Sequence, residues 1–151
     1  VAVTIGIAQG AIDGFIASMK ERSSRFGSKV AEFQSIQLRL AESSAEVDAA
    51  KKIMLSDLKE TMAFLEDNDQ MPIEMMALNK RDMAYCPLLA TRAVDRIFYA
   101  AGAGGLLLSE DIQRSFRDVH AGNKQIALNW DINGTTYGKV ALGLDPAPVR
   151  W

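Results

Sequence analysis

The sequence predicts an all-α protein, an up-and-down bundle of the four-helix type with one additional short helix. Apolar residues recur at helical spacing along several long stretches, and no segment alternates with the period of two that marks a half-buried strand. Short segments rich in glycine, proline or asparagine separate these stretches. A chain of 151 residues can bury one core, so we expect one domain over residues 1–151. Because the sequence begins inside a helical pattern and without methionine, we expect it to be part of a longer chain.

Composition argues against several classes of function. The 17 Lys and Arg residues are scattered among 19 Asp and Glu residues, so we expect no continuous basic face and no nucleic-acid partner. The single cysteine, Cys86, has no partner for a disulfide, which favours the cytoplasm. No metal-binding Glu-x-x-His pair occurs, and no apolar run reaches the roughly 18 to 20 residues that span a bilayer, so we expect neither a metal nor a membrane partner.

The first predicted helix covers residues 2–22 and carries Gly6, Gly10 and Gly14 on one side. Each glycine costs a helix roughly 1 kcal/mol relative to alanine, so we expect something to approach this backbone closely. A neighbouring helix and a flat ligand both fit. Residues 23–28 then break the helical pattern, and the nearby Arg22 and Arg25 either complement the helix C-terminus or bind phosphate.

The second predicted helix is long, covering residues 30–66, and its apolar residues fall at heptad spacing. Gln34 and Gln37 lie among these apolar rows, so we expect them to make polar contacts in the core or contacts with a ligand. After a loop, the third helix covers residues 73–101, and it encloses Arg92, Asp95 and Arg96. Charges inside a bundle need partners, so we expect an Arg-Asp network or a subunit interface here.

The third helix ends in a glycine-rich turn at residues 101–108, which suits a C-cap or a loop that touches a cofactor. Ser109 is expected to cap a short helix that ends near His120, and the last helix is expected over residues 123–144. Between them lies a polar cluster made of His120, Lys124, Gln125, Asn129 and Asp131. The cluster is a candidate site, but its spacing alone names no reaction, and a single histidine at a helix C-terminus is more often structural than catalytic.

Several motifs occur in a characteristic order. GIAQGAID is followed by RSSRFGSKVAEFQSIQLRLAE, RAVDRIFYAAGAGG, RDVHAGNKQIALNWD and GTTYGKVALGLDP. Over nearly the whole chain, this order resembles the C-terminal helical domain of the acyl-CoA dehydrogenase superfamily, and within it the flavin-dependent monooxygenases of two-component systems, which hydroxylate phenols. The resemblance implies a longer chain with an N-terminal helical domain and a β-barrel before this bundle. It also implies a homo-oligomer, expected to be a tetramer.

The resemblance further implies a reduced flavin, FMN or FAD, supplied by a separate reductase component. Phe26, Gly27 and Gln34 match the superfamily pattern, whereas Ser23 stands where the dehydrogenases place an arginine and Phe98 where they place a glutamine. The expected flavin contacts are therefore Arg22, Arg25, Phe26, Gln34, Gly104 and Gly105.

The catalytic positions distinguish the members of the superfamily. Ile126 stands where most dehydrogenases have the glutamate that removes a proton, which argues against a dehydrogenase. Gln125 stands where the monooxygenases often have a histidine, and an amide can bind a phenol but cannot take its proton. We therefore expect Gln125, His120 and Asn129 near a small aromatic substrate. The resemblance implies that reduced flavin and O2 react in a pocket closed to water. An acyl-CoA dehydrogenase domain and a helical module that only assembles remain alternatives, and the isolated fragment is expected to be inactive.

Overall fold

The computed structural model describes residues 1–146 and confirms the all-α prediction. Five α-helices are present in these residues: α1 (Ala2–Glu21), α2 (Gln34–Asp67), α3 (Ile73–Ala101), α4 (Asp111–Gly122) and α5 (Trp130–Ala141). Three short 3-10 turns lie between them: η1 (Val30–Glu32), η2 (Gly102–Leu106) and η3 (Ile126–Leu128).

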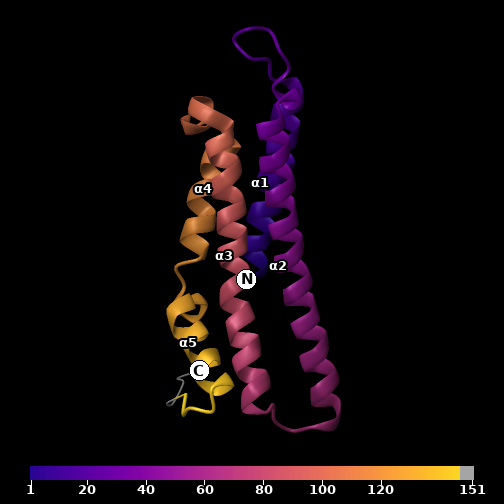
Figure 1. Cartoon of the computed structure of the whole chain (residues 1–151), viewed down its shortest axis with the longest axis vertical. Coiled ribbons are helices and arrows are strands. Elements are labelled where there is room, and N and C mark those ends of the chain that lie inside the picture. Colours follow the sequence, from indigo (N-terminus) through magenta and orange to yellow (C-terminus); the bar gives the residue numbers. More distant parts are fainter. Residues whose placement is uncertain (147–151) are drawn as a thin grey trace.

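Helices α1 to α4 run alternately up and down (Figure 1), and α3 packs against each of the other four. Helices α2 and α3 form a long antiparallel pair joined at one end of the molecule, and α1 packs against α2, α3 and α4. The fourth position of the bundle is shared by α4 and α5, which lie one after the other along α3 (Figure 1). The expected four-helix arrangement with one additional short helix is therefore present, with the fourth column divided.

The core lies where α1, α2, α3 and α4 meet. Its largest fully buried apolar side chains come from three of these helices: Val47 of α2, Val94 and Ile97 of α3, and Val119 of α4. From α1, Ala8, Ile12 and Phe15 pack into the same cluster. One side of α1 thus packs into the core, which is the arrangement that helical spacing of apolar residues predicts.

The prediction of no membrane-length apolar run was wrong for α1. This helix has 20 residues and is long and apolar enough to cross a membrane by length and composition alone. Its apolar side is buried in the bundle instead, because Ile5, Ala8, Ala11, Ile12, Phe15 and Met19 all belong to the core. A core helix passes the same test of composition as a spanning helix.

The prediction that the last helix starts at residue 123 was also wrong. Residues 123–129 form a turn, then η3, and α5 begins only at Trp130. Side chains that bond to nearby backbone explain the break, since Asn and Gln can offer the chain an alternative to a helical hydrogen bond. Similarly, Val30–Glu32 is a 3-10 turn, so α2 begins at Gln34 and not at residue 30.

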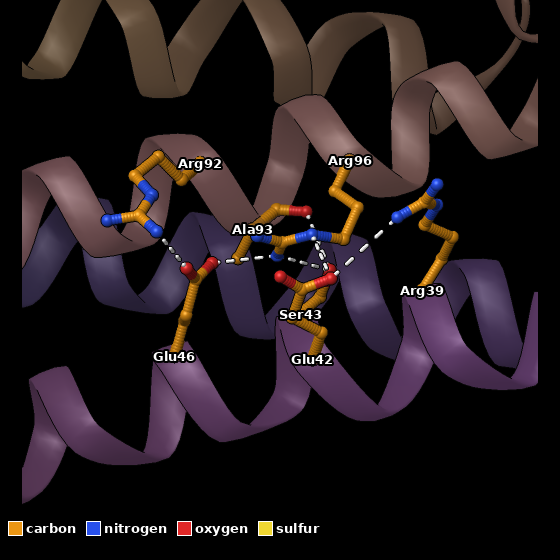
Figure 2. Close-up of polar contacts among 7 residues, drawn as sticks. All are labelled: Arg39, Glu42, Ser43, Glu46, Arg92, Ala93 and Arg96. Carbon is orange, nitrogen blue, oxygen red and sulfur yellow. Dashed lines mark hydrogen bonds and ion pairs between the residues drawn. The ribbon is translucent and has the colours of Figure 1, made fainter.

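The charged residues of α3 are paired, but with other partners than predicted. Figure 2 shows Arg92 and Arg96 reaching from α3 to carboxylates of α2. Arg96 contacts Glu42 at 2.9 Å and Glu46 at 2.7 Å, and Arg92 contacts Glu46 at 2.9 Å. The expected partner, Asp95, lies elsewhere, against α4. Adjacent residues on a helix, such as Asp95 and Arg96, point in different directions, and only the fold decides which neighbours each one meets.

Candidate functional site

A cavity of about 460 Å³ lies at one end of the bundle, between α1, η2 and the first turn of α4. The last turns of α1 provide one wall, with Gly10, Gly14 and Arg22 along it. The opposite wall follows the glycine-rich turn through Gly104 and Gly105. The two walls come from distant parts of the sequence, since residues 22 and 101, which form a hydrogen bond, are 79 residues apart. The cavity is therefore formed by the fold.

Arg22 bridges the two walls. Its Nη1 donates a hydrogen bond of 2.6 Å to the carbonyl oxygen of Ala101, the last residue of α3. This bond satisfies one of the carbonyl groups that a helix leaves without an internal partner at its C-terminus. The same guanidinium lines the cavity, and a guanidinium has five N–H donors, so donors remain for a ligand.

The glycine stripe on α1 faces open space within the described chain. A β-carbon built on Gly6, Gly10 or Gly14 would meet no atom of the described residues within 4 Å beyond the helix itself. The neighbouring helix considered as the reason for the stripe is therefore not among residues 1–146. Gly10 and Gly14 instead form a bare side of the cavity, which a flat group can approach.

Carboxylates and hydroxyl groups complete the cavity. Glu110 and Asp111 line it at the start of α4, together with the hydroxyl-bearing Ser18, Ser109 and Ser115. Ser109 was expected to cap α4, but the N-cap residue is Glu110, and no side chain caps this helix end. In the sequence, Glu110 and Asp111 are acidic residues at the start of α4, where they complement the helix dipole. No local pattern in the sequence indicates that these two carboxylates share a cavity with Arg22.

The other residues expected to contact flavin lie outside this cavity. Phe26 is 93% exposed and sits in the loop between α1 and η1, next to Gly27, whose φ of 86° is a left-handed value that favours glycine. Arg25 and Gln34 are also exposed. Of the two alternatives for Gln34 and Gln37, a contact in the core does not apply, since Gln37 is exposed as well and donates to the Ala31 carbonyl at 3.0 Å. A contact with a ligand stays a prediction.

The second part of the predicted site lies at the seam between α3 and α4. His120 Nε2 is 2.8 Å from Asp95 Oδ1, which leaves Nδ1 as the ring nitrogen without this partner. The imidazole also packs against Phe116, with ring centroids 4.7 Å apart, and Phe116 stacks on Phe98 at 4.3 Å. Both members of the His120–Asp95 pair are partly exposed. The histidine is thus held in a fixed orientation by a carboxylate and an aromatic ring.

Gln125 and Asn129 make local backbone contacts. The Gln125 Oε1 accepts a 2.6 Å hydrogen bond from the amide of Ala127, and the Asn129 Oδ1 accepts a 3.1 Å bond from the amide of Ile132. These contacts cap η3 and α5. Each cap uses only the oxygen of the side-chain amide. The NH2 group of each amide can therefore still donate a hydrogen bond to another group.

The start of α1 lies against this junction. A β-carbon built on Gly122 would be 3.0 Å from the γ-methyl of Thr4, a contact so tight that a larger residue would require Thr4 to shift. Ile126, at the position where dehydrogenases have a catalytic carboxylate, is 75% exposed. The junction therefore presents the N-terminal turn of α1, Gln125 and Ile126 on the surface of the bundle, next to the seam that holds His120.

Comparison with known proteins gives a family. The model of the acyl-CoA dehydrogenase C-terminal domain family matches residues 1–130. The oxygenase component of an FADH(2)-dependent resorcinol hydroxylase from Rhizobium sp. (strain MTP-10005) is 34% identical, over 94% of this chain. A probable acyl-CoA dehydrogenase, YngJ of Bacillus subtilis (strain 168), is 32% identical over 78% of this chain.

A solved structure shows the same fold. The crystal structure of the 3-HSA hydroxylase from Rhodococcus sp. RHA1 has a TM-score of 0.86 and 27% sequence identity, and it covers 94% of this chain. The present chain spans only 37% of that structure and 37% of the resorcinol hydroxylase component. The matched region is thus little more than a third of each relative.

Proposed function

This chain belongs to the acyl-CoA dehydrogenase C-terminal domain family, and we propose that it is the flavin-binding and oligomerisation domain of a flavin-dependent monooxygenase that hydroxylates small aromatic compounds. The observation that carries the proposal is the meeting of Arg22, Gly104 and Gly105 around one cavity. These three residues were expected to contact flavin from the resemblance alone, and the fold brings them together from segments far apart in the sequence.

The groups around the cavity fit part of a flavin. A guanidinium suits a phosphate group, carboxylates and serine hydroxyls suit the hydroxyl groups of a sugar chain, and the bare glycine face admits a flat ring. The cofactor is FADH2 or FMNH2, provided by a separate reductase. Similarity to an FADH(2)-dependent hydroxylase component supports a reduced flavin.

Each residue then has a role that follows from its chemistry. Arg22, Gly104 and Gly105 hold the cofactor, which when bound supplies the electrons that activate O2. Gln125 and Asn129 use their free amide donors to orient the substrate hydroxyl, since their oxygens are occupied by the caps. The imidazole of His120, oriented by Asp95, accepts a proton from the phenol at Nδ1. The exposed apolar side chain of Ile126 helps to exclude water from the reacting groups.

The test uses the intact protein with reduced flavin, O2 labelled with a heavy isotope, and resorcinol or a related phenol. A monooxygenase incorporates one labelled oxygen atom into the aromatic product, which mass spectrometry detects. His120→Gln should lower kcat and remove the limb of the pH profile that reports the base, while His120→Gln protein should keep its affinity for reduced flavin. Absence of labelled product with every phenol tested would reject the proposal.

A dehydrogenase is the second candidate, because the Bacillus relative is named a probable acyl-CoA dehydrogenase. The same preparation separates the two activities. An acyl-CoA dehydrogenase would bleach oxidised flavin on anaerobic addition of an acyl-CoA, whereas a two-component oxygenase would leave it oxidised. Ile126 argues against the dehydrogenase, because a hydrocarbon side chain cannot remove a proton.

The proposal includes a homo-oligomer, with a tetramer as the expected form. Four large apolar side chains on the second half of α2 are exposed, at spacings of three or four residues: Leu55, Leu58, Met62 and Leu65. A second copy of the chain would bury this stripe, as amphipathic helices require. Leu55→Lys with Leu65→Lys should lower the mass measured by light scattering. The cytoplasm is the proposed location, with the single buried Cys86 as its support.

A further inference from the structure

Two side-chain contacts tie the end of α4 to α3. His120 Nε2 lies 2.8 Å from Asp95 Oδ1, and Asn123 Nδ2 donates a hydrogen bond of 3.3 Å to Thr91 Oγ1. On each helix the two residues are about one turn apart and lie on the side that faces the other helix. Two contacts separated along both helices fix the rotation of α4 about its axis, which a single contact would leave free.

The two contacts differ in how far water reaches them. The side chains of His120 and Asp95 are 40% and 33% exposed, so water competes for their contact. Thr91 is only 8% exposed, and its hydroxyl donates a hydrogen bond of 2.8 Å to the carbonyl oxygen of Pro87. Because the hydroxyl hydrogen is used there, Thr91 Oγ1 meets Asn123 as an acceptor. The contact between Asn123 and Thr91 is therefore the better shielded of the two.

The rotation of α4 decides which nitrogen of the histidine carries the hydrogen. An ionised carboxylate only accepts hydrogen bonds, so the nitrogen that faces Asp95, Nε2, is the N–H of the neutral ring, and Nδ1 is the acceptor. An imidazole without this partner divides between the two tautomers. The form of His120 that can take up a proton at Nδ1 therefore depends on the contact with Asp95, and that contact depends on how α4 is rotated.

We infer that Thr91 and Asn123 are positioning residues for the hydroxylation. Their hydrogen bond holds the end of α4 in the rotation that keeps Nε2 of His120 on Asp95, and this leaves Nδ1 to accept the proton of the phenol. The inference rests on the proposed function, in which His120 is the base. Thr91 and Asn123 touch neither substrate nor cofactor in this account, because both act through the histidine. Neither residue was among the expected site residues.

The experiment reads the tautomer of His120 and the kinetics in the same variants. In the intact protein, with histidines labelled by a heavy nitrogen isotope and at a pH where the ring is neutral, NMR distinguishes Nε2–H from Nδ1–H, and His120→Gln assigns the signal. We expect the Nε2–H form in the wild type and a mixture in Thr91→Val and in Asn123→Ala. In both variants kcat should fall about two- to tenfold, the effect of one lost hydrogen bond on an equilibrium, with KM and the affinity for reduced flavin unchanged. Thr91→Ser keeps the hydroxyl and should restore both readouts.

Thr136→Val is the matched control. Thr136 is 6% exposed, and its hydroxyl donates a hydrogen bond of 2.9 Å to the Ile132 carbonyl within α5, as that of Thr91 does to Pro87 within α3. Within residues 1–146, no side chain of another helix donates to Thr136. The substitution therefore removes the same kind of buried local bond without touching α4, and the tautomer and kcat should not change.

The possible outcomes separate this inference from the proposed function. If Thr91→Val and Asn123→Ala keep a single tautomer, or if the tautomers mix while kcat stays at the wild-type value, the inference is wrong and the proposed function stands. Asn123→Ala tests the same contact from the end of α4 if Thr91→Val does not fold. If His120→Gln retains the wild-type kcat, the role of the histidine in the proposed function fails instead.

Discussion

The side chain of Arg22 closes the end of α3 by donating a 2.6 Å hydrogen bond to the carbonyl oxygen of Ala101, 79 residues further along the chain. One side chain thus holds together the end of α1, the end of α3 and the rim of the cavity. The bond fixes the two walls relative to each other before any ligand arrives. An arginine in this position therefore has a structural and a binding role, and substitutions can separate them.

Replacing Arg22 by glutamine removes the cation and this bond. We expect a loss of about 1–2 kcal/mol in the free energy of unfolding, because the Ala101 carbonyl loses a charged donor, and a weaker affinity for reduced flavin. Thermal unfolding and flavin titration measure the two effects. Lys20→Gln is the control, since Lys20 also lies in the last turn of α1 but lines no part of the cavity. If both variants lose the same stability and the same flavin affinity, the effect comes only from removing a positive charge at the end of α1.

The ion pairs drawn in Figure 2 should contribute unequally to the stability of the bundle. Arg96 and Glu46 are only 14% and 13% exposed and are 2.7 Å apart. Glu46→Gln leaves Arg96 without its closest carboxylate, and we expect a loss of about 2–4 kcal/mol by chemical denaturation. Arg39→Ala should cost well under about 1 kcal/mol, because Arg39 and its partner Glu42 are more than half exposed and 3.9 Å apart.

Asp57 should make stability depend on pH. Burial raises the pKa of this carboxyl group to about 6, and repulsion from Asp82 and Glu60 adds to the effect. Because the folded-state pKa lies above the unfolded value of ~3.9, ionisation opposes folding: the penalty is absent below about pH 4 and complete above about pH 6.

Asp57→Asn should accordingly raise Tm at neutral pH, and the gain should shrink as the pH falls through about 6 towards about 4. Differential scanning calorimetry of both proteins at a series of pH values measures this gain. Asp48→Asn, at an exposed position of the same helix, serves as the comparison. A gain for Asp57→Asn that is the same at every pH would contradict the assignment of the effect to ionisation.

Replacing two glycines by alanine should change the free energy of unfolding in opposite directions. Gly102 follows α3 with a φ of 68°, a left-handed value, so Gly102→Ala should lower the free energy of unfolding by about 1–2 kcal/mol. Gly138 lies inside α5, and a β-carbon there would meet no described atom within 4 Å. Gly138→Ala should raise the free energy of unfolding by up to about 1 kcal/mol. Urea unfolding of the two variants compares them directly.

Cys86 should be unreactive in the folded protein. The thiol is buried and donates to the Ala50 carbonyl at 3.3 Å, and burial raises its pKa to about 11. Thiolate is the nucleophile, so alkylation by iodoacetamide should be slow in buffer and fast in denaturant. Mass spectrometry follows the modification. Rapid labelling without denaturant would mean that α2 and α3 separate at this point in solution.

The sequence predicted the parts of the fold that depend on periodicity, and missed those that depend on contacts between distant segments. The bounds of α1 and α3 follow from apolar spacing, and Gly102 marks the end of α3. The late start of α5 was missed because Gln125 and Asn129 bond to the backbone within three residues, an option that competes with helix formation and leaves the apolar pattern unchanged.

The candidate site, like the fold, was predicted only in part. Arg22, Gly104 and Gly105 were identified from motif resemblance and do line one cavity. The involvement of Glu110 and the pairing of Asp95 with His120 were not, because both depend on how α4 is rotated against α1 and α3. A rotation of that kind is fixed by the whole core and has no short sequence signal.

The division of the fourth column into α4 and α5 has a consequence for local unfolding. Helix α4 contributes Val119 to the core, whereas the buried residues of α5 are the polar Asn133 and Thr136, and its packing in the described chain is chiefly against α3. Separation of α5 from α3 therefore exposes no fully buried apolar side chain of α5. Amide hydrogens of α5 should exchange with solvent through openings that leave α1, α2, α3 and α4 intact, well before those of α3.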